Sequence, residues 1–298
     1  MRNVVKWIGI AVGSLVVVLL VAVAGLMISS DLRFSRTYAI TVEDMPIPTD
    51  AASLDVGRRW AEIHCQGCHG PDLGGGPLFE DEALGVVDAP NLTTGRGGIG
   101  TRYQDADWIR ALRHGVRLDG TSVFIMPSSE FYYLNDADLG SLIAYLKTVP
   151  AVDRETRTRT FTPLAKVLYA IGAFENLLYA ETIAHDVRPA APPADVTVEY
   201  GEYLAHAHGC ASCHGVTFEG HQPAEPGAPF APNLTPGGEL GTWSEADFNA
   251  ALRSGTTPSG RILNAAMPWQ GLGHLTDAEL AAIWRYLQSL PAATVETE

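Results

Sequence analysis

The sequence predicts an all-α protein in which two similar helical units follow one N-terminal transmembrane helix. Three observations support this prediction: an uncharged apolar run at residues 7–28, an internal repeat at a spacing of about 141 residues, and amphipathic helical patterns in both copies. The apolar content of 46% supports a packed core and excludes a disordered chain. The net charge of −14 argues against a nucleic-acid partner, because phosphates attract basic surfaces.

The N-terminal apolar run has 22 residues and no charge. At about 1.5 Å per residue it is roughly 33 Å long, enough to cross a hydrocarbon core of about 30 Å. Arg2 and Lys6 precede it, so the positive-inside rule places the N-terminus in the cytoplasm of a bacterium and the body in the periplasm. A cleaved signal peptide is the alternative, since residues 22–24 form an acceptable cleavage site. The run continues past that site to Ile28, so we expect a retained anchor in the inner membrane.

The internal repeat organises the rest of the chain. Five pairs of segments correspond: 65–69 with 210–214, 89–93 with 231–235, 105–115 with 245–255, 126–127 with 267–268, and 134–150 with 275–291. These pairs predict the following division: an anchor at 1–36, a linker at 37–52, a first unit at 53–150, a connector at 151–195 and a second unit at 196–298.

The last helix of each unit has the clearest pattern. In the second unit Thr276 and Glu279 form a capping box at its start. Apolar residues recur at i, i+3, i+4 and i+7 in both copies, and Pro150 and Pro291 end the two helices. The other segments are short helices joined by glycine-rich loops. A unit with so little helix needs a large apolar cofactor to fill its centre.

The connector contains an apolar helical pattern from Phe161 to about Ile183, followed by a Pro/Ala linker at residues 189–194. We expect a helix that packs between the two units. The alternative is a docking surface for a membrane partner or for the membrane itself.

All cysteines lie in two Cys-x-x-Cys-His motifs. The motif residues are Cys65, Cys68 and His69 in the first unit, and Cys210, Cys213 and His214 in the second. This is the attachment signature of c-type haem: the thiols add to the vinyl groups, and the histidine binds the iron. A redox dithiol or half of a zinc site is the alternative, but neither requires the adjacent histidine. The sequence therefore predicts two covalently bound haem c groups.

A methionine in each unit is the candidate for the second axial ligand. Met126 follows Cys65 by 61 residues and Met267 follows Cys210 by 57 residues, and each is followed by proline. Met45 has no counterpart in the repeat. A lone methionine is more often core filler, but two equivalent Met-Pro sites predict iron ligands. His/Met ligation closes the iron to substrates and leaves electron transfer.

Seven further histidines are predicted to be surface or loop residues: His64, His114, His185, His206, His208, His221 and His274. The alternative is bis-histidine ligation of one haem, with His114 or His221 as the ligand.

The repeated Ala-Pro-Asn-Leu-Thr segments are candidates for contacts around the iron ligands. The carbonyls of Pro90 and Pro232 are expected to accept a hydrogen bond from the proximal imidazole N–H, which fixes its tautomer. Asn91 and Asn233 are expected either to bind a haem propionate or to cap the turn.

Two further pairs occupy equivalent positions in the repeat. Arg113 and Arg253 are expected to pair with a propionate or to lie at a solvated helix end. Trp108 and Phe248 are expected to be core aromatics, with the haem edge as a further contact.

Taken in their order along each unit, these motifs resemble class I cytochrome c domains. More narrowly, they resemble the multihaem cytochrome c subunits of membrane-bound alcohol and gluconate dehydrogenases. The resemblance covers about residues 53–298. Those subunits typically hold three haem domains, whereas this chain has two motifs and an N-terminal apolar segment. The resemblance implies two tandem cytochrome c-type domains with haem on the four cysteines, proximal histidines and distal methionines.

We therefore expect a membrane-anchored dihaem cytochrome that relays single electrons on the periplasmic side, as the electron-transfer subunit of a dehydrogenase or respiratory complex. Its expected partners are the membrane and redox proteins: a membrane dehydrogenase, a quinol-oxidising complex or a terminal oxidase. No bond-making catalysis and no small-molecule substrate are expected. The alternatives are a dihaem peroxidase, which needs one iron without a permanent sixth ligand, and a haem subunit of a photosynthetic or oxidase complex.

Overall fold

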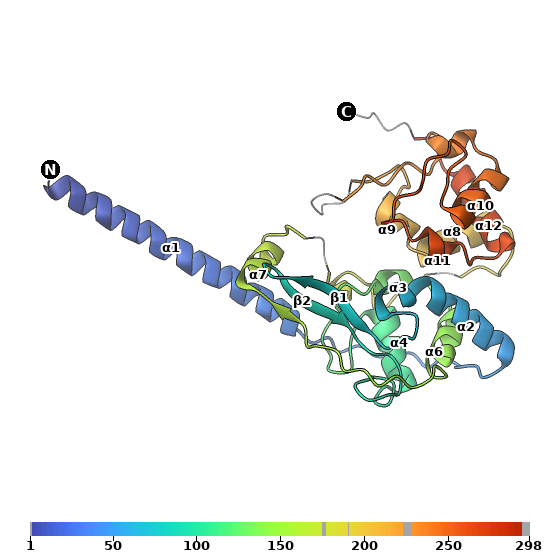
Figure 1. Cartoon of the computed structure of the whole chain (residues 1–298), viewed down its shortest axis with the longest axis horizontal. Coiled ribbons are helices and arrows are strands. Elements are labelled where there is room, and N and C mark those ends of the chain that lie inside the picture. The colour runs from blue at the N-terminus through green and yellow to red at the C-terminus, as the bar shows by residue number, and fades with distance from the viewer. Residues whose placement is uncertain (1, 175–176, 190, 223–227, 294–298) are drawn as a thin grey trace.

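The computed structural model describes residues 2–174, 177–189, 191–222 and 228–293. It is mostly helical, as predicted, and its two units lie side by side with one long helix projecting from the first (Figure 1). The first unit contains α2 (Ala51–His64), α3 (Gln66–His69), β1 (Gly76–Asp81), β2 (Gly85–Ala89), α4 (Asp105–His114), α5 (Ser128–Phe131) and α6 (Asp136–Leu146). The second contains α8 (Val198–Ala207), α9 (Cys210–His214), η2 (Glu239–Thr242), α10 (Glu245–Ser254), α11 (Trp269–Leu272) and α12 (Asp277–Ser289).

The projecting helix is α1 (Arg2–Ser35). Among the described residues it is the one helix long and apolar enough to cross a membrane, judged by length and composition. Its apolar side chains are exposed over most of its length, whereas its last turns contact the connector. Ser30 Oγ donates to the carbonyl of Lys166 at 2.6 Å, and Lys166 pairs with Asp31 at 2.7 Å.

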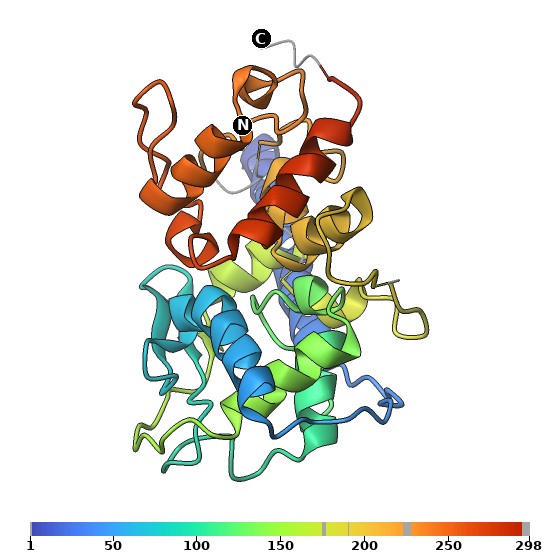
Figure 2. The same cartoon turned by 90° about the vertical axis from the view of Figure 1, so that its right-hand side faces the viewer.

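Each unit is built on a crossing of its first and last helices, α2 with α6 and α8 with α12. Figure 2 shows the α8–α12 pair above the α2–α6 pair. Glycine allows both crossings to be close. A Cβ on Gly57 would lie 1.9 Å from the Ser141 carbonyl oxygen, and one on Gly201 would lie 2.0 Å from that of Ala282. The apolar stripe of each last helix is buried, apart from the half-buried Trp284, whose ring packs against Phe248. Helix α12 begins with the predicted capping box.

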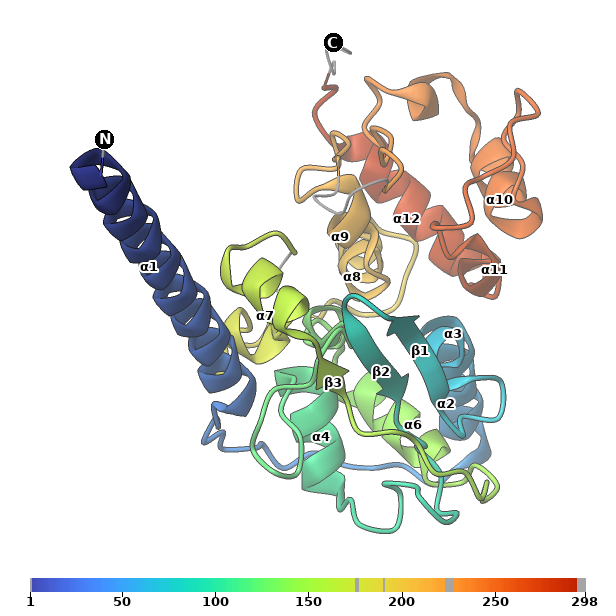
Figure 3. The same cartoon turned by 60° about the vertical axis from the view of Figure 1, so that its left-hand side comes forward.

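A small antiparallel sheet was not predicted. It has the order β1-β2-β3, where β3 (Thr160–Phe161) comes from the connector (Figure 3). The valines at 86 and 87 have strand propensity, and burial alternates along β2. β1 is almost wholly exposed, and β3 is two residues long, so neither has an amphipathic pattern that the sequence could reveal.

The predicted connector helix from Phe161 to about Ile183 is wrong in its extent. The structure has α7 (Pro163–Ala170) and, after a break, the short helix η1 (Tyr179–Glu181). Thr162 caps α7, and Gly172 adopts a φ of +75°, which ends the helix just after Ile171. Residues 175–176, inside the predicted span, lie outside the described residues. Instead of lying between the units, α7 packs against the end of α1.

The two units meet through corresponding elements. α5 of the first unit contacts α8 of the second, and α11 of the second contacts α2 of the first. Tyr203 Oη donates to Asp138 Oδ2 at 2.5 Å, and Arg59 pairs with Glu279 at 3.2 Å across this boundary.

Candidate haem-attachment sites

The first attachment motif lies at the end of α2. Cys65 ends α2 and begins α3, and the backbone N–H of His69 donates to the Cys65 carbonyl at 2.8 Å. This single helical turn holds the motif in a fixed shape. Cys65 is buried, Cys68 is exposed, and His69 is only 7% exposed. The turn thus directs one thiol inward and one outward, with the imidazole inside the unit.

The second motif repeats this arrangement. Gly209, with a φ of +71°, separates α8 from α9, which runs from Cys210 to His214. Cys210 is half-buried and Cys213 is exposed, while His214 is 6% exposed. The four cysteines, all of them described, form no disulfide with one another.

Both motif imidazoles are oriented by a backbone carbonyl. His69 Nδ1 lies 2.8 Å from the Pro90 carbonyl oxygen, and His214 Nδ1 lies 2.7 Å from that of Pro232. Because a carbonyl can only accept, Nδ1 carries the proton and Nε2 keeps its lone pair for a metal. Burial lowers the pKa of both imidazoles, which favours the neutral, metal-binding form.

The asparagines of the repeated loops are fully engaged with protein groups. Asn91 Oδ1 accepts from Thr93 N–H at 2.9 Å, and its Nδ2 donates to the Val152 carbonyl at 2.7 Å. Asn233 makes the same pair of contacts, with Thr235 and Ala293, at 2.8 and 2.7 Å. This geometry corresponds to the turn-capping alternative, and it ties each loop to the chain that follows the last helix.

Of the two arginines, Arg113 differs from the expectation of a solvated helix end. Its side chain is only 3% exposed, so it does not lie at a solvated helix end. It pairs with Glu43 and donates to the Leu134 carbonyl at 2.8 Å. Burial raises the pKa of Glu43, but hydrogen bonds from Arg113, its own backbone and His114, with the charge of Arg113, together outweigh burial and lower the pKa to about 2. Arg253 is more exposed and pairs with Asp277 at 2.9 Å.

The two candidate methionine ligands occupy matching turns. Met126 and Met267 are half-buried and pack against the core, each directly before a one-turn helix. The carbonyl of Met126 accepts from Ser128 N–H at 2.8 Å, and that of Met267 accepts from Trp269 N–H at the same distance. Met45, by contrast, is a core residue that is 7% exposed.

The donor set suits a c-type haem. Each unit offers two thiols, an imidazole with a protonated Nδ1, and a thioether. Within the described ranges, His, Cys, Asp and Glu form no group of three or more that could hold a metal ion. Trp108 is 3% exposed, and its Nε1 has no hydrogen-bond partner among the described atoms. A haem carboxylate would satisfy such an N–H.

The prediction that all other histidines are surface or loop residues is wrong for three of them. His64 and His208 are buried where the units meet: His64 Nε2 lies 2.8 Å from His208 Nδ1, and the His208 ring stacks on Trp60 at 4.5 Å. His114 is buried as well, with its ring nitrogens 3.1 Å from Glu43 and 3.2 Å from His185. Contacts between units and with the linker bury these rings, and a single-unit pattern cannot reveal such contacts.

Glu130 is a residue that the sequence analysis missed. It lies on α5, within 3.9 Å of His64 Nδ1, and it accepts a hydrogen bond from Ser212 of the second motif. Burial raises the pKa of Glu130 to about 7. The one available signal is an asymmetry of the repeat, because the corresponding residue of the second unit is Gly271.

Comparison with known proteins identifies the repeated unit. The cytochrome c family model matches residues 55–150 and 198–291, which together exceed half of the chain. The prediction of two cytochrome c-type domains in a mostly helical chain is thus confirmed.

Several curated proteins are similar over most of the chain. The alcohol dehydrogenase (quinone) cytochrome c subunit of Gluconacetobacter polyoxogenes is 28% identical over 272 residues, 81% of this chain and 57% of that protein. The fructose dehydrogenase cytochrome subunit of Gluconobacter japonicus is 31% identical over 261 residues, which cover 80% of this chain and 51% of that protein. The gluconate 2-dehydrogenase cytochrome c subunit of Pantoea cypripedii is 35% identical over 102 residues, which cover 31% of this chain and 23% of that protein.

The resemblance to dehydrogenase cytochrome c subunits is confirmed by these matches. The chain spans about half the length of the first two of these relatives.

Proposed function

The chain belongs to the cytochrome c family, and on this premise we propose that it is a membrane-anchored dihaem cytochrome that relays single electrons on the periplasmic side, as a subunit of a dehydrogenase complex. Family membership implies covalently bound haem c. The observation that carries the proposal is the duplicated geometry: a Cys-x-x-Cys-His turn, a carbonyl-bound imidazole and a Met-Pro turn in each unit.

Each unit contributes four groups to its haem. In the first, the thiols of Cys65 and Cys68 would hold the porphyrin, while His69 and Met126 would bind the iron. In the second, the corresponding groups come from Cys210, Cys213, His214 and Met267. The iron supplies a one-electron couple, and thioether ligation keeps its potential high. With both axial positions taken by the protein, no position remains for a substrate.

The peroxidase alternative requires one iron that lacks a protein sixth ligand. The matching Met-Pro turns, with the same backbone hydrogen bond in both units, disfavour it.

Anchoring by α1 and a periplasmic body follow from the apolar helix and the basic residues before it. The named relatives are cytochrome subunits of dehydrogenases, so a dehydrogenase is the proposed electron donor. A quinol-oxidising complex or a terminal oxidase is the proposed further redox partner.

Two measurements on the detergent-purified full chain test this function. Intact mass should show two added haems that resist acid–acetone extraction, and the Cys65→Ala/Cys68→Ala variant should carry one. Cyanide should bind slowly to both oxidised haems. Rapid cyanide binding at one haem, or peroxide turnover, would favour the peroxidase.

The partner is tested by purification in mild detergent, where a dehydrogenase catalytic subunit should accompany the cytochrome. Its consistent absence, with another respiratory complex in its place, would overturn that part of the proposal.

A further inference from the structure

Helix α7 carries apolar side chains on two faces. Ala165 and Tyr169 form the inner face and are buried. On the other side, Leu164, Val167, Leu168 and Ile171 form a stripe at i, i+3, i+4 and i+7, which we call the outer stripe. Leu164 is 50% exposed and Ile171 is 61% exposed. A helix on the surface of a water-soluble domain places polar residues on such a face, so this stripe suits a surface other than water.

The position of α7 along α1 is fixed by specific contacts. The backbone carbonyl of Lys166 accepts the hydrogen bond from the Ser30 hydroxyl. The apolar run of α1 ends two residues earlier, at Ile28. Ser30 therefore lies about 3 Å past the end of that run along the helix axis. When α1 crosses a bilayer, this level is the boundary between acyl chains and headgroups. Figures 1 and 3 show α7 at the edge of the body that borders the free length of α1.

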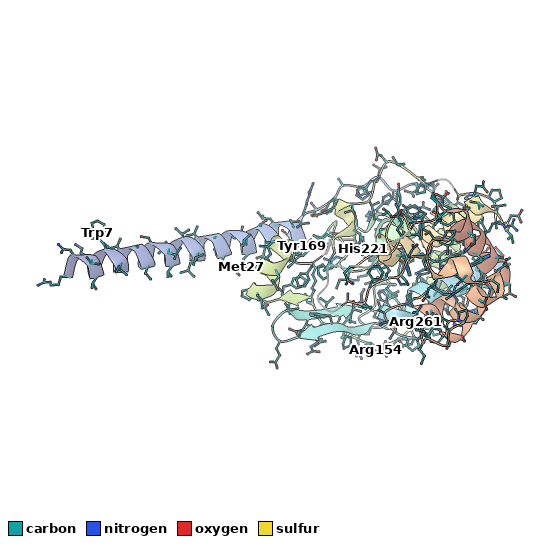
Figure 4. All side chains as sticks on the ribbon, turned by 90° about the horizontal axis from the view of Figure 1, so that it is seen from above. Trp7, Met27, Arg154, Tyr169, His221 and Arg261 are labelled. Carbon is teal, nitrogen blue, oxygen red and sulfur yellow. The ribbon has the colours of Figure 1, made fainter. Side chains whose placement is uncertain are left out.

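The orientation of α7 follows from its inner face. Tyr169 contacts residues further along α1: its ring lies 4.8 Å from the Phe34 ring, and Arg33 lies 4.7 Å from its centroid. Figure 4 shows Tyr169 close to the body end of α1, with Met27 farther from the body, toward Trp7. The outer stripe lies on another side of α7 than Tyr169, and Leu164 and Ile171 stay exposed there.

The junction between α1 and the body is packed rather than linked by a loose segment. The Phe34 ring also lies 4.8 Å from the Phe161 ring and 6.0 Å from the Phe124 ring. The direction of α1 therefore sets the placement of α7 against the bilayer.

We propose that α7 is a second membrane contact, with its outer stripe buried in the interfacial layer of the lipid bilayer beside α1. This inference rests on the proposed anchoring by α1. The occupant of the stripe is lipid, because the stripe is apolar, lies at headgroup depth and is oriented by a helix that itself suits the bilayer. A second contact restrains the tilt of the first unit and so sets the height of its haem site above the membrane.

Site-directed labelling of the full chain in liposomes tests the proposal. In the holoprotein the four native thiols hold haem, so an introduced cysteine is the one reactive thiol. Leu164→Cys and Ile171→Cys are labelled with a fluorophore and exposed to lipid-borne or water-soluble quenchers. We expect strong quenching by headgroup-proximal lipid quenchers and protection from the aqueous one. Val216→Cys, at an 83% exposed position in the second unit, is the matched control and should show the reverse.

A label at Val17→Cys, within α1, separates the two proposals. If Val17 is quenched from lipid while positions 164 and 171 behave like Val216, anchoring stands and the α7 contact is overturned. If Val17 is also accessible to water, the proposed anchoring itself fails. Protection of 164 and 171 only after a dehydrogenase is added would overturn lipid as the occupant in favour of a protein partner.

Discussion

Under the proposed ligation, single side chains would determine whether each iron is closed to external ligands. We expect Met126→Ala to remove the sulfur-to-iron charge-transfer band of the first haem only, and Met267→Ala that of the second only. Each change should lower the potential of its own haem, because water or hydroxide replaces a soft thioether. Covalent attachment should persist. The measurements are the oxidised absorption spectrum and a potentiometric titration.

Met45→Ala is the matched control, since Met45 is buried but has no partner in the repeat. It should leave both spectra and potentials unchanged while lowering the free energy of unfolding by about 2–5 kcal/mol. A Met126 variant that behaves like the Met45 variant would identify Met126 as core filler.

Candidate site residues that lie within one unit could be named from the sequence, and their ligand roles stay predictions. The attachment cysteines, their histidines and the Met-Pro pairs stand out because chemistry demands fixed types at fixed spacing. Arg113, His64 and His208 were misjudged because their environments come from the linker and from the other unit. Single-sequence periodicity reports which face of an element is apolar, but not which distant segment covers a polar side chain.

At the scale of elements, the helix crossings depend on two glycines. Gly57→Ala and Gly201→Ala should each destabilise their unit by roughly 1–3 kcal/mol, because a Cβ would overlap the facing carbonyl. This loss should appear although alanine favours helix by up to about 1 kcal/mol. Denaturant unfolding of the holoprotein, followed by far-UV circular dichroism, measures the effect.

Gly67→Ala is a suitable control, because a Cβ there meets nothing within 4 Å and the second motif has Ser212 at that place. Equal destabilisation by all three substitutions would contradict the close-approach explanation.

Elements with strong periodicity were predicted well, as α6 and α12 illustrate. The sheet and the short α7 were not, for a common physical reason. A two-residue strand is stabilised by its partner and not by its own sequence, and one glycine with a positive φ ends a helix inside an apolar run. Apolar content alone does not distinguish a long helix from a short helix followed by a packed turn.

For the whole molecule, the contact between units should respond to pH through Glu130. Its raised pKa means that the folded protein holds a proton which the unfolded chain releases between 4.5 and about 7. The stability of the wild type should therefore fall as pH rises through that window. The side chain of the Glu130→Gln variant cannot titrate. The free energy of unfolding of this variant, relative to that of wild type, should therefore rise from about pH 4.5 to 7, by up to about 3 kcal/mol.

Urea unfolding of both proteins at about pH 5 and pH 8 provides the comparison. The lowered pKa values of His64 and His208 should destabilise both proteins below about pH 6.5. Glu82→Gln, which removes a carboxyl from an exposed turn away from the boundary between the units, is the matched control. If the difference in free energy of unfolding between Glu130→Gln and wild type is the same at both pH values, the Glu130 carboxyl does not titrate in this range.

The reciprocal contact of α5 with α8 and of α11 with α2 has the form of an isologous dimer interface enclosed in a single polypeptide. Two identical subunits must present identical residues to each other, whereas a fused pair can diverge on either side. Glu130 and Gly271 occupy corresponding places, so an ionisable group faces the second attachment motif while none faces the first from that position. Under the proposed function, two irons with the same ligands would thereby acquire unequal electrostatic surroundings, which would give a symmetric pair of carriers a preferred direction for the electron.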